Sequence, residues 1–417
     1  MCKRCSTLPH SGQVQAPEAP KAQAQSSPLD ITANNPANPD NQVFRKREQK
    51  QLRRRPLPDR QDFRIRIFKM RKAAGRFLGG RVEKCGCAPV PGSGSVAMVK
   101  NENGIFYRGL QRCSSVWVCP YCSYKISSYR AKQIAQITEK VIGSGGSAGM
   151  ATFTISHHAY QSLEAVLTGV RSIWDKMTKH RDFKKLMKLW DRIGYVKALE
   201  VTHGEHGWHP HFHVLFWSWE DSESHREIIE GMFSIWQDVA TKNGYLALEK
   251  GFSYSEVKNE AGIAEYVSKW GVAKEVAQGN IKKSGHAGGR SPFQILDEIQ
   301  RATEPKPVDI ALIQEYADAF KGKRQLTWSR GVKKEWLSLD DLSDEEICKK
   351  EEEGEAQLVI ERKVWHQAIN RDLPPILINE LEAKGKAAVL KALNNSGIAC
   401  QLYGNRITDS PPKILTL

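Results

Sequence analysis

Several features of common protein classes are missing from this 417-residue sequence. No uninterrupted apolar run approaches the length of a membrane span, and residues 1–60 lack the apolar core of a signal peptide. Large apolar residues are almost absent from the same segment, which predicts a disordered tail. No P-loop is present, so nothing indicates a nucleotide-driven motor. We therefore expect a cytoplasmic protein with no membrane partner.

Positive charge dominates the composition. The sequence has 62 Lys and Arg residues against 47 Asp and Glu, a formal net charge of +15. This balance favours a polyanionic partner, and nucleic acid is the first expectation. A basic run containing Arg53, Arg54 and Arg55 closes the N-terminal tail. It could contact phosphates without sequence preference or simply be a solvated segment.

Nine cysteines are present, and in the cytoplasm they are expected as free thiols or metal ligands rather than disulfides. Cys119-Pro-Tyr-Cys122 places two thiols one turn apart. Cys113, with either Cys85 or Cys87, could complete a four-thiolate zinc site. A CxxC pair containing proline could instead be a redox pair. Structural zinc is the favoured interpretation.

Histidines alternate with other residues in the segment 209–217, which is typical of a strand that carries imidazoles on one face. The segment 195–202 also predicts a strand, and the glycines between the two indicate a hairpin turn. With the turn centred between residues 205 and 206, Glu200 lies opposite His211. Glu200, His211 and His213 are thus a candidate metal site. The ligand types alone would also suit iron in an oxygenase.

The predicted elements have the order strand, helix, strand, strand, helix, strand. This order predicts an α+β fold with a ferredoxin-like, split βαβ antiparallel sheet and helices on one face, plus a Cys-rich N-terminal module. We expect a tail over 1–60, the Cys-rich module and a basic helix over 61–145, and a nuclease-like domain over 146–335. An acidic linker and a small helical appendage are expected over 336–417. Lys323, Arg324 and Trp328 combine cations with an aromatic ring, as nucleic-acid backbone-binding surfaces do.

Tyr266 and Lys269 are three residues apart on a predicted helix over 262–273 and therefore share a face. A tyrosine hydroxyl is a poor nucleophile unless a neighbouring cation stabilises its anion. A phosphodiester is an electrophile that suits both the basic charge and a divalent metal. These residues therefore predict attack of Tyr266 on a DNA phosphate.

At these residues the sequence resembles plasmid rolling-circle replication initiators, the Rep proteins of the HUH endonuclease superfamily. The resemblance covers roughly residues 82–333. It rests most specifically on Gly207-Trp-His-Pro-His-Phe-His-Val-Leu215 and on Ala264-Glu-Tyr-Val-Ser-Lys-Trp270. Three further segments support it: 113–130, 152–157 and 320–331.

The resemblance implies that His211 and His213 bind Mg²⁺ or Mn²⁺, that Tyr266 is the nucleophile and that Lys269 assists near the phosphate. It also implies nicking of single-stranded DNA at a plasmid double-strand origin, and recruitment of a host helicase and polymerase to the 3′ end. Related initiators use a glutamate one turn before the tyrosine to activate water. Gly262 occupies that position here, and Glu265 and Glu260 are the nearest carboxylates.

Two other functions are compatible with the same residues. One is a zinc-containing protein that binds an origin without cutting it. The other is a relaxase or transposase that uses the same metal and tyrosine chemistry.

Overall fold

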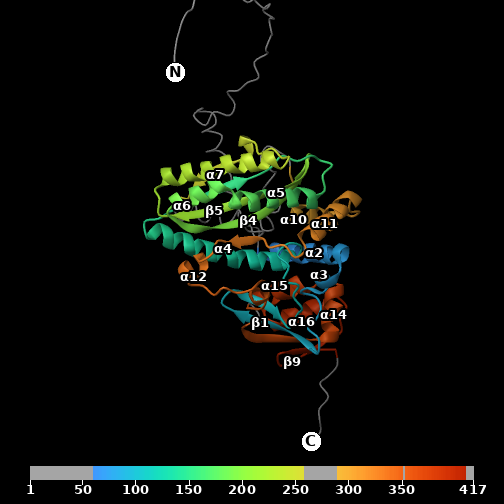
Figure 1. The fold of residues 1–417 in the computed structure, drawn as a ribbon. Coiled ribbons are helices and arrows are strands. Elements are labelled where there is room, and N and C mark those ends of the chain that lie inside the picture. The colour runs from blue at the N-terminus through green and yellow to red at the C-terminus, as the bar shows by residue number, and fades with distance from the viewer. Residues whose placement is uncertain (1–59, 258–288, 351–352, 410–417) are drawn as a thin grey trace, which may run out of the picture. The chain divides into compact units, whose positions relative to one another are not determined.

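The computed structural model describes residues 60–257, 289–350 and 353–409. Figure 1 shows the arrangement of its elements. The described helices are α2 (Arg60–Leu78), α3 (Gly80–Lys84), α4 (Pro120–Gly143), α5 (Leu163–Lys179), α6 (Arg181–Leu189), α7 (Ser222–Lys242), α10 (Pro292–Arg301), α11 (Pro307–Phe320), α12 (Val332–Trp336), α13 (Asp344–Lys350), α14 (Arg362–Asn370), α15 (Pro374–Lys384) and α16 (Lys386–Asn395). The described strands are β1 (Ser95–Asn101), β2 (Gly104–Arg108), β3 (Ser147–Phe153), β4 (Arg192–Gly204), β5 (Gly207–Ser218), β6 (Ser253–Glu256), β7 (Leu326–Trp328), β8 (Glu355–Glu361), β9 (Gln401–Tyr403) and β10 (Arg406–Thr408).

The first of two sheets in the described residues is antiparallel and has the strand order β6-β3-β5-β4-β7. Its long hairpin, β4–β5, turns between Gly204 and Gly207, as the sequence predicts. Gly207 has a φ of +82°, which favours glycine, and a Cβ there would lie only 3.2 Å from the Cα of Ala159. The hairpin register places Glu200 directly opposite His211, which confirms that prediction.

Helices cover both faces of this sheet, which corrects the prediction that they lie on one face. Helices α5, α6 and α7 lie on one side of β4 and β5, and α4 lies on the other (Figure 1). Alternate residues of β5 supply the two cores: Phe212, Val214 and Phe216 pack towards α5 and α7, while Leu215 and Trp217 pack towards α4. The apolar stripe of α4 packs on β3, which follows it in the chain, and on the more distant strands β4 and β5, so the sequence alone did not show which face of the sheet it covers.

A second, mostly antiparallel sheet has the strand order β2-β1-β8-β10-β9. It has its own hydrophobic core around Trp365. Residues 355–409 therefore contribute three strands and three helices, where the sequence predicted a small helical appendage. Strand β8 pairs with β1 from Ser95↔Glu361 to Lys100↔Glu355. The two paired strands are about 260 residues apart in the sequence, so no local pattern indicates that they pair. This separation explains the wrong prediction.

The helix predicted over 262–273 and the basic residues Arg53, Arg54 and Arg55 lie outside the described residues, as does the tail predicted over 1–60 apart from Arg60, the first residue of α2. The division of the chain at 60, 145 and 335 stays a prediction. Within the described ranges, no helix has both the length and the apolar character that crossing a membrane would require.

Candidate functional site

Two strands bring three potential metal ligands together. Glu200 on β4 and His211 and His213 on β5 each place one ligand atom within 4.8 Å of the others. Glu200 Oε2 lies 3.4 Å from Nε2 of His213 and 3.8 Å from Nε2 of His211. Two imidazole nitrogens and a carboxylate oxygen converging at these distances could hold a divalent ion.

The other ring nitrogen of each histidine is also engaged. Nδ1 of His211 lies 3.0 Å from the backbone carbonyl of His209 and must donate to it, which fixes the proton on Nδ1 and directs Nε2 towards Glu200. Nδ1 of His213 lies 2.9 Å from Oγ1 of Thr152, which accepts a further hydrogen bond from Ser253. Such outer partners orient metal-binding imidazoles and raise their basicity.

The site is partly open to solvent. The side chains of His211 and His213 are 11% and 17% exposed, and that of Glu200 is 28% exposed. A centre with an open side can accept a substrate oxygen as well as protein ligands.

His209 continues the histidine face of β5 but is not one of the three converging residues. Its Nδ1 lies 2.8 Å from Nε2 of His157, and its ring stacks on that of His211 at 5.2 Å. Burial, followed by the nearby His211 and His157, lowers the pKa of His209 to about 3. His209 is therefore a neutral hydrogen-bonding neighbour of the site.

A separate cluster of thiols lies where α3 ends and α4 begins. Sγ of Cys85 is 3.6 Å from that of Cys119 and 3.5 Å from that of Cys122, and Cys113 is 3.7 Å from Cys122. All four residues are buried. Thiolates bound at ~2.3 Å around a tetrahedral ion lie about 3.8 Å apart, so the cluster has dimensions that fit a metal ion.

The structure resolves the choice between two cysteines. Cys85 belongs to the four-thiol group and Cys87 does not. The Cys87 carbonyl instead accepts a 2.7 Å hydrogen bond from the indole of Trp365 on α14, in the core of the second sheet. Contacts from the thiols of Cys113 and Cys119 lower the pKa of Cys122, which favours a thiolate in the cluster.

Sequence reasoning missed Cys348, a buried thiol on α13 that interacts with Cys122. Nζ of the buried Lys125 donates a 3.5 Å hydrogen bond to the backbone carbonyl of Cys348. No motif links Cys348 to the CxxC pair, because 225 residues separate them in the sequence.

Of the predicted DNA-binding residues Lys323, Arg324 and Trp328, the first and the last have protein partners. Lys323 forms a 2.9 Å ion pair with Glu164, whereas Arg324 is exposed. The Trp328 ring stacks on Trp217 at 6.2 Å on β5. Packing therefore accounts for Trp328, and DNA contact by these residues stays a prediction.

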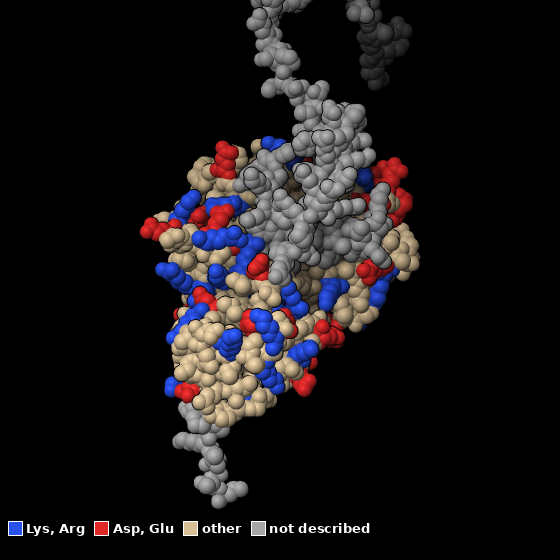
Figure 2. All heavy atoms as spheres, turned by 180° about the vertical axis from the view of Figure 1, so that it is seen from behind, with Lys and Arg blue, Asp and Glu red and all other residues tan. Residues whose placement is uncertain are grey.

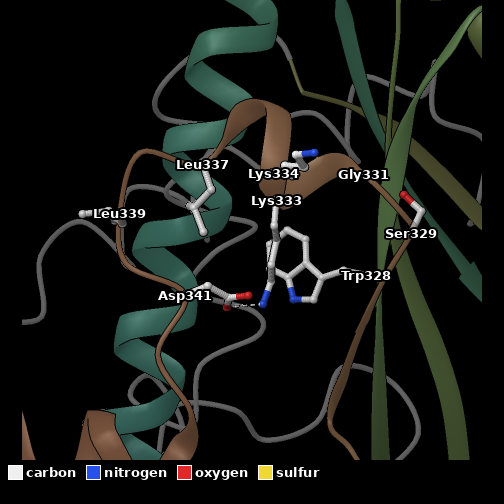
Figure 3. Close-up of a pocket in the computed structure, with 8 residues that line it drawn as sticks. All are labelled: Trp328, Ser329, Gly331, Lys333, Lys334, Leu337, Leu339 and Asp341. Carbon is white, nitrogen blue, oxygen red and sulfur yellow. Dashed lines mark hydrogen bonds and ion pairs between the residues drawn. The ribbon is translucent and has the colours of Figure 1, made fainter.

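Trp328 also lines a pocket of about 500 Å³ beside β7 and α12. Figure 3 shows Lys333 running along the Trp328 ring towards Asp341, while Lys334 points away. Nζ of Lys333 lies 5.0 Å from the ring centroid and 2.6 Å from Oδ1 of Asp341. The cation and the aromatic ring therefore stabilise each other across the pocket.

The acidic segment after this pocket packs against the basic helix α4. Arg130 forms ion pairs with Asp341 at 3.6 Å and Asp344 at 3.1 Å, and Gln133 donates to the carbonyl of Asp340. Part of the positive charge of α4 is thus neutralised within the chain. On the face shown in Figure 2, Lys and Arg side chains are interspersed with Asp and Glu.

Tyr266, Lys269 and Glu265 lie outside the described residues, so their distance from Glu200, His211 and His213 stays a prediction.

Fold and site together define an α+β protein with two potential metal centres, one open and one buried. A family model described as "Replication protein" matches residues 107–372, more than half of the chain. The chain belongs to the replication protein family, and the expected likeness to plasmid replication initiators is thereby confirmed.

Two curated relatives are similar to parts of the chain. "Protein rep" of Streptomyces lividans is 26% identical over 315 residues, which cover 60% of this chain and 69% of the relative. "Neomycin resistance protein" of Streptomyces cyanogenus is 30% identical over 161 residues, which cover 32% of this chain and 37% of the relative. No solved structure matches the chain.

Proposed function

We propose that this protein initiates plasmid rolling-circle replication by nicking single-stranded DNA at the double-strand origin, with Tyr266 as the nucleophile. The observation that carries the proposal is the convergence of Glu200, His211 and His213 on one sheet face, with the outer nitrogen of each imidazole held by an oxygen. Family membership supports the same process.

The strand order adds support for an HUH endonuclease fold. Numbered by their order along the chain, strands β3 to β6 have the spatial order 4-1-3-2. This is the order of a ferredoxin-like, split βαβ sheet. Its central strands, β3 and β5, carry Thr152 and the two histidines side by side.

In the proposed reaction, the phenolic oxygen of Tyr266 forms a bond to phosphorus and the bond from phosphorus to the 3′ oxygen breaks. The phenol loses its proton, and the departing 3′ oxygen takes one up. One phosphodiester replaces another, so strand rejoining remains possible. Lys269 would stabilise the phenolate, and Glu265 is a candidate for activating water when a round ends.

Glu200, His211 and His213 would hold Mg²⁺ or Mn²⁺. When bound, such an ion polarises a phosphate oxygen and neutralises charge that develops in the transition state. Cys85, Cys113, Cys119 and Cys122 would hold a structural Zn²⁺, because four buried thiols leave no position for a substrate.

The proposal extends to the setting of the reaction. The substrate is plasmid DNA, the protein acts in the cytoplasm, and the released 3′ end is taken over by a host helicase and polymerase.

A covalent-adduct assay tests this function. With Mn²⁺ and supercoiled plasmid carrying its own origin, the wild-type protein should nick the plasmid and migrate with attached DNA in a denaturing gel. Tyr266→Phe should bind the origin and form no adduct. An active Tyr266→Phe protein would refute the nucleophile. Metal-independent origin binding without nicking would indicate the non-catalytic alternative.

A further inference from the structure

An exposed aromatic pair, Tyr160 and His158, lies in the segment that follows β3. Tyr160 is 85% exposed, and its ring stacks on that of the exposed His158 with 5.3 Å between centroids and 4° between planes. Since the stack covers one ring face of Tyr160, the other is open to solvent. A ring this exposed contributes little to the folding core and keeps one face available to a ligand.

The backbone around this pair is fixed rather than loose. The Gln161 side chain accepts a 2.8 Å hydrogen bond from N–H of His158, and the backbone of Ala159 packs against the hairpin glycine Gly207. Upstream, the backbone N–H of Ser156 donates to the carbonyl of Leu246 at 2.7 Å. The backbone that carries the ring is therefore held in place before any partner binds, which lowers the entropic cost of binding.

The pair is connected to the metal site by adjacent histidines. His157 precedes the stacked His158 and contacts His209, and His209 lies one strand repeat, ~7 Å, from His211. A polynucleotide with one phosphate at Glu200, His211 and His213 would therefore have neighbouring nucleotides within reach of Tyr160. Leu246 and Leu248, 57% and 44% exposed, add apolar surface along the segment bonded to Ser156.

We propose that Tyr160, backed by His158, is a stacking platform for an unpaired base of single-stranded DNA next to the nick site. An open, preordered ring suits an unstacked base, whereas bases in a duplex are already stacked on each other. This assignment rests on the proposed function, because it takes its substrate from the nicking reaction.

The test measures binding of the full-length protein to a fluorescein-labelled dT 20-mer by anisotropy. Tyr160→Ala removes one base stack and should weaken binding by roughly 5- to 150-fold. Tyr160→Phe should bind within about twofold of wild type, because the ring face remains. Tyr160→Leu should bind as weakly as Tyr160→Ala, because leucine has no aromatic face for a base to stack on. It thereby separates stacking from simple apolar contact. Binding of Tyr160→Ala equal to wild type, or full rescue by leucine, would overturn the platform.

Trp219→Ala is the matched control. Trp219 is an aromatic residue, 43% exposed, that follows the opposite end of β5, and its loss should leave dT affinity unchanged. An equal loss in both variants would mean that exposed aromatic surface acts without regard to position, against the proposal.

Photocrosslinking gives a second readout. A 20-mer with 5-iodouracil should crosslink to the peptide containing Tyr160, and the crosslink should disappear in Tyr160→Leu. Crosslinks that map only elsewhere would contradict the platform. Both readouts use DNA without an origin and need no cleavage. A protein that shows the platform but forms no covalent adduct would therefore refute the nicking function alone.

Discussion

The two potential metal centres differ in what surrounds them. Glu200, His211 and His213 lie on the surface of two strands with partly exposed side chains, whereas the cluster that includes Cys119 and Cys122 is enclosed between helices. An open carboxylate and imidazole site leaves room for a substrate oxygen. A closed set of thiols has no such position and can act only through the fold. We therefore expect the open site to serve the proposed chemistry and the closed site to serve stability.

The largest effect is expected at the closed site. Cys119→Ser should abolish zinc binding and lower the melting temperature by roughly 10 °C or more, because structural zinc contributes ~10–16 kcal/mol in small zinc domains. Zinc content by mass spectrometry and thermal unfolding by circular dichroism check this. Unchanged stability of a zinc-free protein would remove the distinction between the two centres.

Cys87→Ser is the control for that experiment. Cys87 lies two residues from Cys85 but outside the four-thiol group, so zinc content should match wild type. Loss of zinc in this variant would mean that the wrong cysteine has been assigned.

At the open site we expect a substitution to weaken metal binding without destabilising the fold. His213→Ala should weaken Mn²⁺ binding by more than ~100-fold, because loss of an outer partner alone costs ~10–100-fold. Isothermal titration calorimetry measures the affinity. The melting temperature without metal should stay near that of wild type, since the His213 side chain is partly exposed. Unfolding of His213→Ala would assign this histidine to the core.

Substitutions of Thr152 test the hydrogen bond that orients the ligand His213. Thr152→Val removes the oxygen that holds Nδ1 of His213 and should weaken Mn²⁺ binding ~10–100-fold. Thr152→Ser keeps the hydroxyl and should restore most of the affinity. If valine and serine variants bind Mn²⁺ equally well, the hydroxyl has no orienting role.

The smallest expected effect is a pH dependence of stability caused by His225, a buried histidine outside both metal centres. His225 is fully buried against Ser147, and burial lowers its pKa to about 4. The unfolded chain, with a pKa near 6.5, then binds a proton that the folded chain excludes, so stability is full above pH 6.5 and falls towards pH 4. Between pH 7 and pH 5 the loss is about 2 kcal/mol.

Urea unfolding at the two pH values checks this expectation. His225→Gln should be less stable at pH 7 but lose about 2 kcal/mol less than wild type on acidification. An equal loss in both proteins would show that His225 does not carry this pH dependence.

The two centres also differ in how well the sequence predicts them. A strict period of two and one hairpin turn were enough to place Glu200 opposite His211, because strand register is local. The thiol cluster depends on the path of the chain from α3 to α4, so Cys85 and Cys87 could not be separated and Cys348 was not found. The second sheet escaped prediction for the same reason, as β1 and β8 meet only in the folded chain.

The position of helices followed the same rule. The helix α4 and the hairpin β4–β5 were each predicted from local periodicity, and both are confirmed. Which face α4 covers depends on tertiary packing, and the prediction of helices on one face was wrong. The role of Tyr266 stays a prediction.

The most direct test of the central claim is pulsed electron paramagnetic resonance of the Mn²⁺-loaded protein, which detects imidazole nitrogens bound to manganese. Wild type should show nitrogen couplings from two imidazoles, and His213→Ala, loaded at an Mn²⁺ concentration high enough to offset its weaker binding, should show couplings from one. A spectrum without imidazole nitrogen, or one that His211→Ala and His213→Ala both leave unchanged, would contradict the claim.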